Sequence, residues 1–256
     1  MMLLIFGIGT LIGSFLGLVI DRLPQGRTFV FGRSECDACH HSLKPYDLVP
    51  ILSFFSTKGT CRMCHSKLSL RYPLMELITG IAYMLCYLNW GLSSSLVLSL
   101  AFVSILIVVA MIDFNTMIIY DRFHILILLI ALIEMRILPG DGRNHLLGSM
   151  VVSIPYFILA KLSKGIGLGD VKLMASAGFF LGVRNTVVAF IISTLMGGIY
   201  AIIGLVSNKH KGGDAIPFGP FLCFGIFVAY LYGSSIIQWY TTLLQCGVFK
   251  LGNKKL

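Results

Sequence analysis

The sequence predicts an all-α, polytopic membrane protein of about eight transmembrane helices, with a small cytoplasmic zinc-binding module inserted after the first helix. Three observations lead to this fold class. The 256-residue chain is 57% hydrophobic and only 12% charged, with a mean hydropathy of +0.88. Apolar stretches recur along it, and one polar segment holds four closely spaced cysteines. Because a soluble domain carries about 25% charged residues, this composition excludes an ordinary soluble enzyme.

Eight apolar stretches approach the roughly 20 residues that a bilayer-spanning helix needs. They cover residues 3–20, 73–92, 95–112, 122–138, 146–162, 171–183, 186–206 and 218–238. A chain inside hydrocarbon must satisfy its own backbone hydrogen bonds, so each stretch is expected to be helical. The first lacks a charged segment before it and a small-residue cleavage site, which favours a retained helix over a signal peptide.

The basic residues predict the orientation and the domain boundaries. Residues 21–72 form the only sizeable polar segment and hold eight of the twenty Lys and Arg residues. If this segment is cytoplasmic and the spans alternate, fourteen basic residues lie inside and six outside, in line with the positive-inside bias. Lys250, Lys254 and Lys255 then fall on the outer side, against the bias. A re-entrant or ninth membrane segment near the C-terminus would return them to the cytoplasmic side. We expect a first transmembrane helix (1–20), a cytoplasmic four-cysteine module (21–72) and a membrane domain (73–256).

The polar segment contains two C-x-x-C pairs separated by 21 residues. The pairs are Cys36 with Cys39 and Cys61 with Cys64. Two such turns can close a tetrahedral zinc site, and the spacing is close to that of zinc ribbons. Redox-active pairs or disulfides are the alternatives, and a cytoplasmic location favours thiolate ligands. Four thiolates leave no open coordination position, so we expect this zinc to support folding rather than catalysis.

The other cysteines and the nearby histidines have simpler interpretations. Cys86, Cys223 and Cys246 lie in or beside apolar runs and are expected to be small buried residues. His40, His41 and His65 adjoin the four-cysteine pairs. They are either exposed loop histidines or replacements for a metal ligand.

Three of the eleven acidic residues fall where an apolar stretch meets a cytoplasmic joint: Asp113, Asp121 and Asp170. Burial at the membrane edge is costly for a carboxylate, which makes each one a functional candidate. Asp113 ends its helix, where a negative charge is unfavourable, so capping does not explain it and a solvated loop residue is the alternative. Asp170 could instead cap the helix that follows it.

Two features favour a catalytic role for Asp170 over a capping role: the glycines before it, and a second aspartate predicted on the same face of the membrane. Gly165, Gly167 and Gly169 permit close backbone approach, which a cap does not need and an extended peptide substrate would use. The predicted topology assigns Asp113 and Asp170 to the same face. Two neighbouring carboxyl groups can share a proton, so that one acts as acid and the other as base. Asp121 either orients this site or simply begins the next helix.

Motifs along nearly the whole chain resemble the type 4 prepilin peptidase family of Gly-x-Gly-Asp membrane aspartic proteases. Residues 13–24 (GSFLGLVIDRLP) resemble the family's N-terminal helix and its exit. The four-cysteine module, with YDLVPILSF (46–54) and LRYPLMELITG (70–80), resembles its first cytoplasmic loop. IDFNTMIIYD (112–121), GLGDVKLMASAGFFLG (167–182) and IPFGPFL (216–222) resemble its two aspartate motifs and its penultimate signature.

This resemblance implies a membrane aspartic endopeptidase that removes the leader of type IV prepilins or pilin-like proteins on the cytoplasmic side, cutting after a glycine. Asp113 and Asp170 would be the catalytic pair. Gly167, Gly169, Asp121 and Lys172 would support the same site. The substrates implied are pilins, pseudopilins of type II secretion and pilin-like proteins of DNA uptake.

The resemblance also implies a second activity, a cofactor and a location. Many members N-methylate the new N-terminus with S-adenosyl-L-methionine, and the cysteine module is a feature of such bifunctional forms. Glu76, in the matching motif YPLMELITG, would serve methyl transfer or stabilise the basic loop. The expected location is the bacterial plasma (inner) membrane with the active site facing the cytoplasm. Membrane lipid is an expected partner and nucleic acid is not.

Two other functional classes fit part of the pattern. A secondary transporter could use the aspartates for proton coupling, but it would be expected to hold them in broken helices near the bilayer midplane. A zinc-dependent assembly scaffold would tolerate loss of the aspartates and not of the cysteines. A leader-cleavage assay separates these hypotheses.

Overall fold

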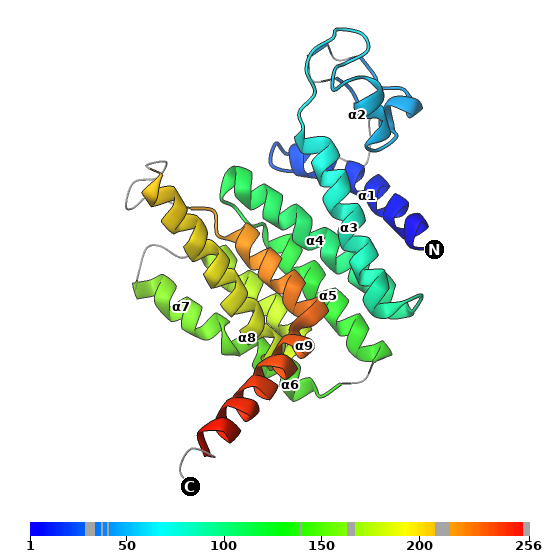
Figure 1. The fold of residues 1–256 in the computed structure, drawn as a ribbon. Helices are drawn as coiled ribbons and strands as arrows, with labels where there is room; N and C mark the ends of the chain where they lie inside the picture. The colour runs from blue at the N-terminus through cyan, green and yellow to red at the C-terminus, as the bar shows by residue number, and fades with distance from the viewer. Residues whose placement is uncertain are drawn as a thin grey trace. The chain divides into compact units, whose positions relative to one another are not determined.

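The computed structural model describes residues 1–28, 34–36, 38–39, 41–138, 140–162, 167–207 and 216–252, without the side chains of Pro45 and residues 246–252 (Figure 1). The regular secondary structure of the described residues is helical, with two isolated β-bridges and no strand among them. The chain divides into two compact units, Met1–Ile112 and Asp113–Leu256. Outside the described residues lie several positions that the sequence analysis singled out: His40, Gly165, Lys254, Lys255 and the side chains of Cys246 and Lys250.

In the first unit, helices α1 (Met2–Arg22) and α3 (Arg71–Trp90) pack side by side (Figure 1). Glycines four residues apart on α1 permit the close approach. A Cβ atom on Gly13 would lie 2.8 Å from the Cα atom of Glu76, and one on Gly9 would lie 2.8 Å from the Cα atom of Gly80. This is the small-residue contact that membrane helices use. It brings the polar residue after Gly13, Ser14, next to Glu76.

The segment between α1 and α3 holds two similar cysteine turns, the 3-10 helix η1 (Pro45–Leu48) and the short helix α2 (Leu52–Ser56). An antiparallel bridge closes each turn: Glu35 with Ser42 in the first and Thr60 with Lys67 in the second. Helix α4 (Ser94–Thr116) follows α3. The hydroxyl groups of Tyr83 on α3 and Ser104 on α4 are hydrogen-bonded at 2.8 Å.

The second unit is built around helix α8 (Leu168–Val206) (Figure 1). Four helices pack against it: α5 (Asp121–Ile137), α6 (Gly142–Val151), α7 (Ser153–Leu162) and α9 (Gly219–Gly252). The backbone of α8 leaves helical geometry at Gly182, where φ is 74°. The amide oxygen of Asn144 on α6 accepts the N–H of Val183 there, at 3.2 Å. A side-chain amide therefore satisfies a donor that the kink exposes.

Five of the described helical segments are long and apolar enough to cross a membrane, which supports a polytopic membrane protein. They are Met2–Arg22, Ser94–Thr116, Gly142–Leu162, Leu168–Val206 and Gly219–Gln245. Two predicted stretches, 171–183 and 186–206, both lie in α8, whose kink at Gly182 falls at the end of the first. Helices α3 and α5 cover two more and are not among the five, so the count of eight stays a prediction. Cys86 and Cys223 are buried, which confirms their predicted role.

Candidate active site and metal centre

Asp113 lies in the last turn of α4 and is almost fully buried, with 5% of its surface exposed. Its Oδ2 atom accepts a hydrogen bond of 2.9 Å from the backbone N–H of Gly219, the first residue of α9. The first N–H groups of a helix have no partner within it and favour a negative charge. A Cβ atom on residue 219 would lie 2.6 Å from Oδ2, so glycine is required for this contact.

Asp170 is the third residue of α8 and is 9% exposed. Its carboxylate accepts a hydrogen bond from the backbone N–H of Gly167, the N-cap residue, and it interacts electrostatically with Asp113. A third-position acid that accepts the N-cap N–H is half of a capping box. Asp170 therefore helps to begin α8, although the N-cap itself is Gly167, and it also lies close enough to Asp113 for their charges to interact.

The two glycines next to Asp170 have separate structural roles. A Cβ atom on Gly169 would lie 3.1 Å from the Cβ atom of Ile119, which belongs to the loop that follows Asp113. A Cβ atom on Gly167 would lie 3.3 Å from Oδ2 of Asp170. The small residues therefore let the two aspartate motifs approach each other.

Asp121 and Lys172 form an ion pair beside this site. Asp121 begins α5 and its Oδ1 atom lies 2.7 Å from Nζ of Lys172 on α8. Both side chains are more than half exposed. The hydrogen bond from Lys172 lowers the pKa of Asp121. Asp121 thus begins its helix and links it to α8, as one of its two predicted roles requires.

Tyr156 on α7 is a residue of this site that the sequence analysis missed. It is buried, interacts electrostatically with Asp170 and forms a hydrogen bond with Thr194. Its ring centroid lies 6.5 Å from that of Phe218, the residue before Gly219. It therefore contacts the surroundings of both carboxylates. Tyr156 stands in an apolar run with no motif around it, so no signal in the sequence singled it out.

The four predicted ligand cysteines come together in the first unit. The sulfur atoms of Cys36, Cys39, Cys61 and Cys64 all lie within 4.8 Å of one another. The sulfur atoms of Cys36 and Cys64 are 3.8 Å apart. Four thiolates at about 2.3 Å from a tetrahedral zinc ion would be separated by about 3.8 Å. The cluster therefore fits a zinc ion, and the described residues add no histidine to it.

The electrostatics of the cluster favour the thiolate at two of its four cysteines, whereas desolvation and the three neighbouring thiols raise the pKa of Cys39 to about 11. The backbone N–H groups of Cys39 and Ala38 lower the pKa of the Cys36 thiol to about 6. Hydrogen bonds from the side chain and backbone of Ser66 lower the pKa of Cys64. A lowered pKa favours the thiolate, which is the form that binds a metal. These cysteines are free thiols rather than disulfides.

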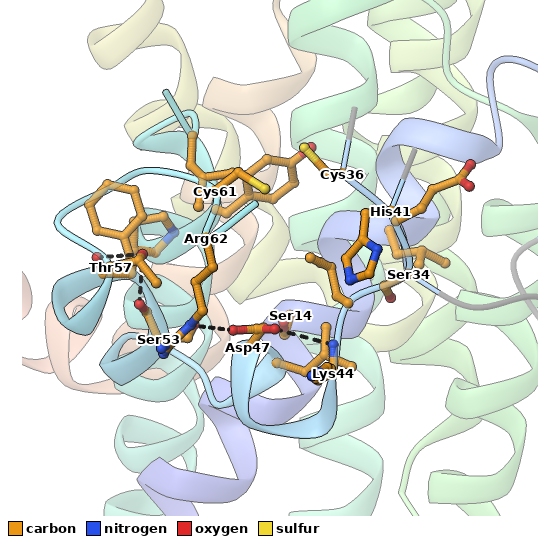
Figure 2. Close-up of a pocket in the computed structure, with 18 of the residues that line it drawn as sticks. Ser14, Ser34, Cys36, His41, Lys44, Asp47, Ser53, Thr57, Cys61 and Arg62 are labelled. Carbon is orange, nitrogen blue, oxygen red and sulfur yellow. Dashed lines mark hydrogen bonds and ion pairs between the residues drawn. The ribbon is translucent and has the colours of Figure 1, made fainter. Parts of the chain in front are cut away.

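A cavity of about 310 Å³ lies between the cysteine turns and the adjoining ends of α1 and α3. Cys36 and Cys61 line one part of it, and Ser14 and Glu76 line another. Figure 2 shows Asp47 between Arg62 and Lys44: it accepts a 2.7 Å hydrogen bond from Arg62 Nε and one of 3.2 Å from the backbone N–H of Lys44.

Glu76 is the most buried acidic side chain of this cavity, with 7% of its surface exposed. Its Oε2 atom accepts the backbone N–H of Ile51 at 2.7 Å, and it forms a second hydrogen bond with Ser14. Among the described residues it forms no ion pair with any Lys or Arg. Ile51 lies within the basic segment of residues 21–72, so this hydrogen bond supports the interpretation that Glu76 stabilises the basic loop, through its backbone rather than through a charge.

The chain matches two protein-family models. Residues 7–90 match the Bacterial Peptidase A24 N-terminal domain, and residues 100–202 match the Type IV leader peptidase family. No solved structure matches the chain at a significant level.

Several curated relatives are similar over almost their whole length. A prepilin leader peptidase/N-methyltransferase of Bacillus subtilis is 34% identical, over 94% of this chain and 98% of the relative. Proteins of the same name from Aeromonas salmonicida (29% identical, 94% of each chain) and Pseudomonas aeruginosa (28% identical, 95% of this chain and 93% of the relative) are also similar. The chain belongs to the Type IV leader peptidase family.

Proposed function

We propose that this protein removes the leader peptide of prepilins or pilin-like proteins and methylates the new N-terminus, with Asp113 and Asp170 as the hydrolytic pair. The observation that carries the hydrolytic assignment is the pair itself. Two buried carboxyl groups from separate motifs interact electrostatically, and each accepts a backbone N–H at the start of a helix. The names of the similar proteins support both activities.

The chemistry proposed for the pair is general acid–base hydrolysis. One carboxylate accepts a proton from a water molecule as the water attacks the scissile carbonyl carbon, and the other carboxyl group donates a proton to the reacting peptide. Gly219 positions Asp113, and Gly167 and Gly169 position Asp170 against the loop after Asp113. Asp121 and Lys172 would act only by fixing α5 to α8.

The test is leader removal from a co-expressed prepilin by Asp113→Asn and Asp170→Asn variants. We expect each variant to lose at least about 100-fold in rate, since each removes one partner of the proton transfer. Asp121→Asn makes the same chemical change at an exposed, ion-paired position and should cleave normally. Normal cleavage by either member of the pair would contradict the mechanism. It would leave the transporter and scaffold hypotheses open.

Zinc would be held by Cys36, Cys39, Cys61 and Cys64 and would serve folding. The support is the tetrahedral spacing of the sulfur atoms and the absence of an open ligand position in a four-thiolate site. The ion would fix the two cysteine turns to each other and so shape the cavity that Cys36 and Cys61 line.

S-Adenosyl-L-methionine would be the methyl donor, and the cavity of the first unit is the site that we propose for methyl transfer. Its volume suits a small-molecule ligand, and it is lined by acidic, basic and aromatic side chains. Glu76, the methyl-transfer candidate of the sequence analysis, lines it.

The membrane arrangement follows from the charge distribution. We propose eight spans in the bacterial plasma membrane, with the module of residues 21–72 and the aspartate pair on the cytoplasmic side and residues 73–256 as the peptidase domain. The substrate would then meet the pair where its polar leader joins its apolar helix, beside the lipid headgroups. Cysteine labelling from each side of the membrane tests this topology.

A further inference from the structure

Glu76 is a buried carboxyl group with no cationic partner in the described part of the chain. Its two partners, the Ile51 N–H and Ser14, are uncharged. A buried carboxylate without a cationic partner is costly. A carboxylate offers about four acceptor positions, so acceptor capacity remains for a ligand.

The other acidic side chains of the cavity differ from Glu76. Asp47 is paired with Arg62 at 2.7 Å, and Asp21 is paired with Arg71 at 2.9 Å. Glu35 is exposed, so water can solvate its charge. Glu76 is therefore the acidic group of this cavity that would gain most from binding a cation.

The backbone that contacts Glu76 is strained. Ile51 has a φ of 62° and a ψ of −53°, outside the regions that a β-branched residue ordinarily adopts. Such strain persists where surrounding contacts enforce it and is concentrated at functional sites. Here the Ile51 N–H fixes the orientation of the Glu76 carboxylate.

The position of Glu76 indicates the kind of cation. It lies in the second turn of α3, and Tyr72 and Pro73, one turn earlier on the same face, line the cavity with it, as does Leu18 of α1. A cationic group followed directly by an apolar chain would match a buried carboxylate with apolar surface beside it. Leader removal from a pilin-like protein yields such a group, because the new α-ammonium precedes the apolar helix.

We propose that Glu76 binds the α-ammonium group of the trimmed substrate and accepts its proton before methyl transfer. This inference rests on the proposed function. The ammonium proton passes to the Glu76 carboxylate, which frees the nitrogen lone pair. That pair forms the new N–C bond with the methyl carbon of the sulfonium donor, while the C–S bond breaks and its electron pair stays on the sulfur.

The test measures binding without the methyl donor. A dye-labelled apolar peptide with a free N-terminus, and the same peptide N-acetylated, are titrated onto the purified full chain in detergent. We expect the free peptide to bind wild type at least about tenfold more tightly than the acetylated one, because a charge-assisted hydrogen bond is lost on acetylation. Glu76→Gln should remove this preference, and Glu76→Asp should retain part of it.

Glu35→Gln is the matched control, since it makes the same chemical change on an exposed carboxylate of the same cavity and should keep the preference. Equal binding of both peptides by wild type, or an unchanged preference in Glu76→Gln, would overturn the inference. The glutamine can still accept the Ile51 N–H, so zinc content and melting temperature should stay near wild type. A large fall in both, with equal weakening for the two peptides, would show a purely structural role. Leader cleavage by the wild-type preparation tests the proposed function separately.

Discussion

The two units each contain a nearly buried acidic side chain that accepts a backbone N–H from a distant segment. In the second unit Asp113 accepts a hydrogen bond from the N–H of Gly219, and in the first unit Glu76 accepts one from the N–H of Ile51. The difference lies in the remaining neighbours. Asp113 interacts with a second carboxyl group, Asp170. Glu76 lines a cavity, and within the described residues no other acid is found to interact with it.

This difference separates two kinds of chemistry. A pair of carboxyl groups can divide the roles of acid and base and so activate water. A single carboxylate beside a cavity can bind a cation and take one proton from it. An acid that accepts a hydrogen bond from a distant backbone N–H would therefore serve hydrolysis in one unit and amine binding in the other, in the roles that we propose.

The largest expected effect comes from a substitution that disturbs the Asp113–Asp170 pair without replacing either acid. Gly219→Ala places a Cβ atom 2.6 Å from Oδ2 of Asp113 and should reduce leader cleavage by about 100-fold or more, because small displacements of a catalytic group have effects of this size. Helix propensity alone predicts the opposite, a slight gain in stability. The measurement is the initial rate of leader removal from a purified prepilin.

Gly198→Ala controls for this substitution. A Cβ atom there would meet nothing within 4 Å, so the variant should cleave at the wild-type rate. A Gly219→Ala variant as active as this control would show that the hydrogen bond to Asp113 is not needed.

The next effect concerns the four-cysteine cluster of the first unit. Cys36→Ser should lower the zinc content from about one ion per chain to a small fraction of that, because the site loses one of its four thiolates. The free-amine peptide should then bind weakly, since Cys36 lines the cavity. Elemental analysis and the peptide titration measure the two effects. Cys86→Ala removes a buried cysteine outside the cluster and should leave the zinc content unchanged.

A smaller effect is expected from a substitution in the contact between α1 and α3 at Glu76. Gly13→Ala would bring a Cβ atom within 2.8 Å of the Glu76 Cα atom and should destabilise the first unit by about 1–3 kcal/mol, as overpacking does. Gly7→Ala, on the same helix but with nothing within 4 Å, should be neutral or stabilising. Denaturation of both variants in detergent measures the difference. Equal stability would mean that α1 can shift away from α3 without cost.

The sequence predicted which residues come together better than it predicted their surroundings. The four cysteines and the two aspartates were found from short motifs, because metal ligands and glycine-flanked acids follow local spacing rules. Gly219 lay within a matching motif, but its hydrogen bond to Asp113 joins residues 106 positions apart. No local rule predicts such a contact.

The features that escaped prediction depend on packing between helices. The kink at Gly182 is stabilised by Asn144 on another helix, and the positive φ of Ile51 is held by Glu76 on α3. Tyr156 has the hydropathy of an ordinary membrane residue, and only the fold brings it beside Asp170. Hydropathy and local motifs predict which segments are helical, whereas these residues depend on which helices come together.

The smallest expected effect concerns the exposed pair that joins α5 to α8. Lys172 lowers the pKa of Asp121 in the folded protein, so the pair stabilises the fold above the pKa of an unfolded aspartate, about 3.9. That contribution is lost as the pH falls through the lowered pKa. Asp121→Asn should therefore melt slightly below wild type at pH 7, and the two melting curves should coincide at the lowest pH. Because both side chains are exposed, the difference at pH 7 should be small and should shrink with added salt. A difference that persisted at low pH would mean that Asp121 contributes by packing or capping rather than by charge.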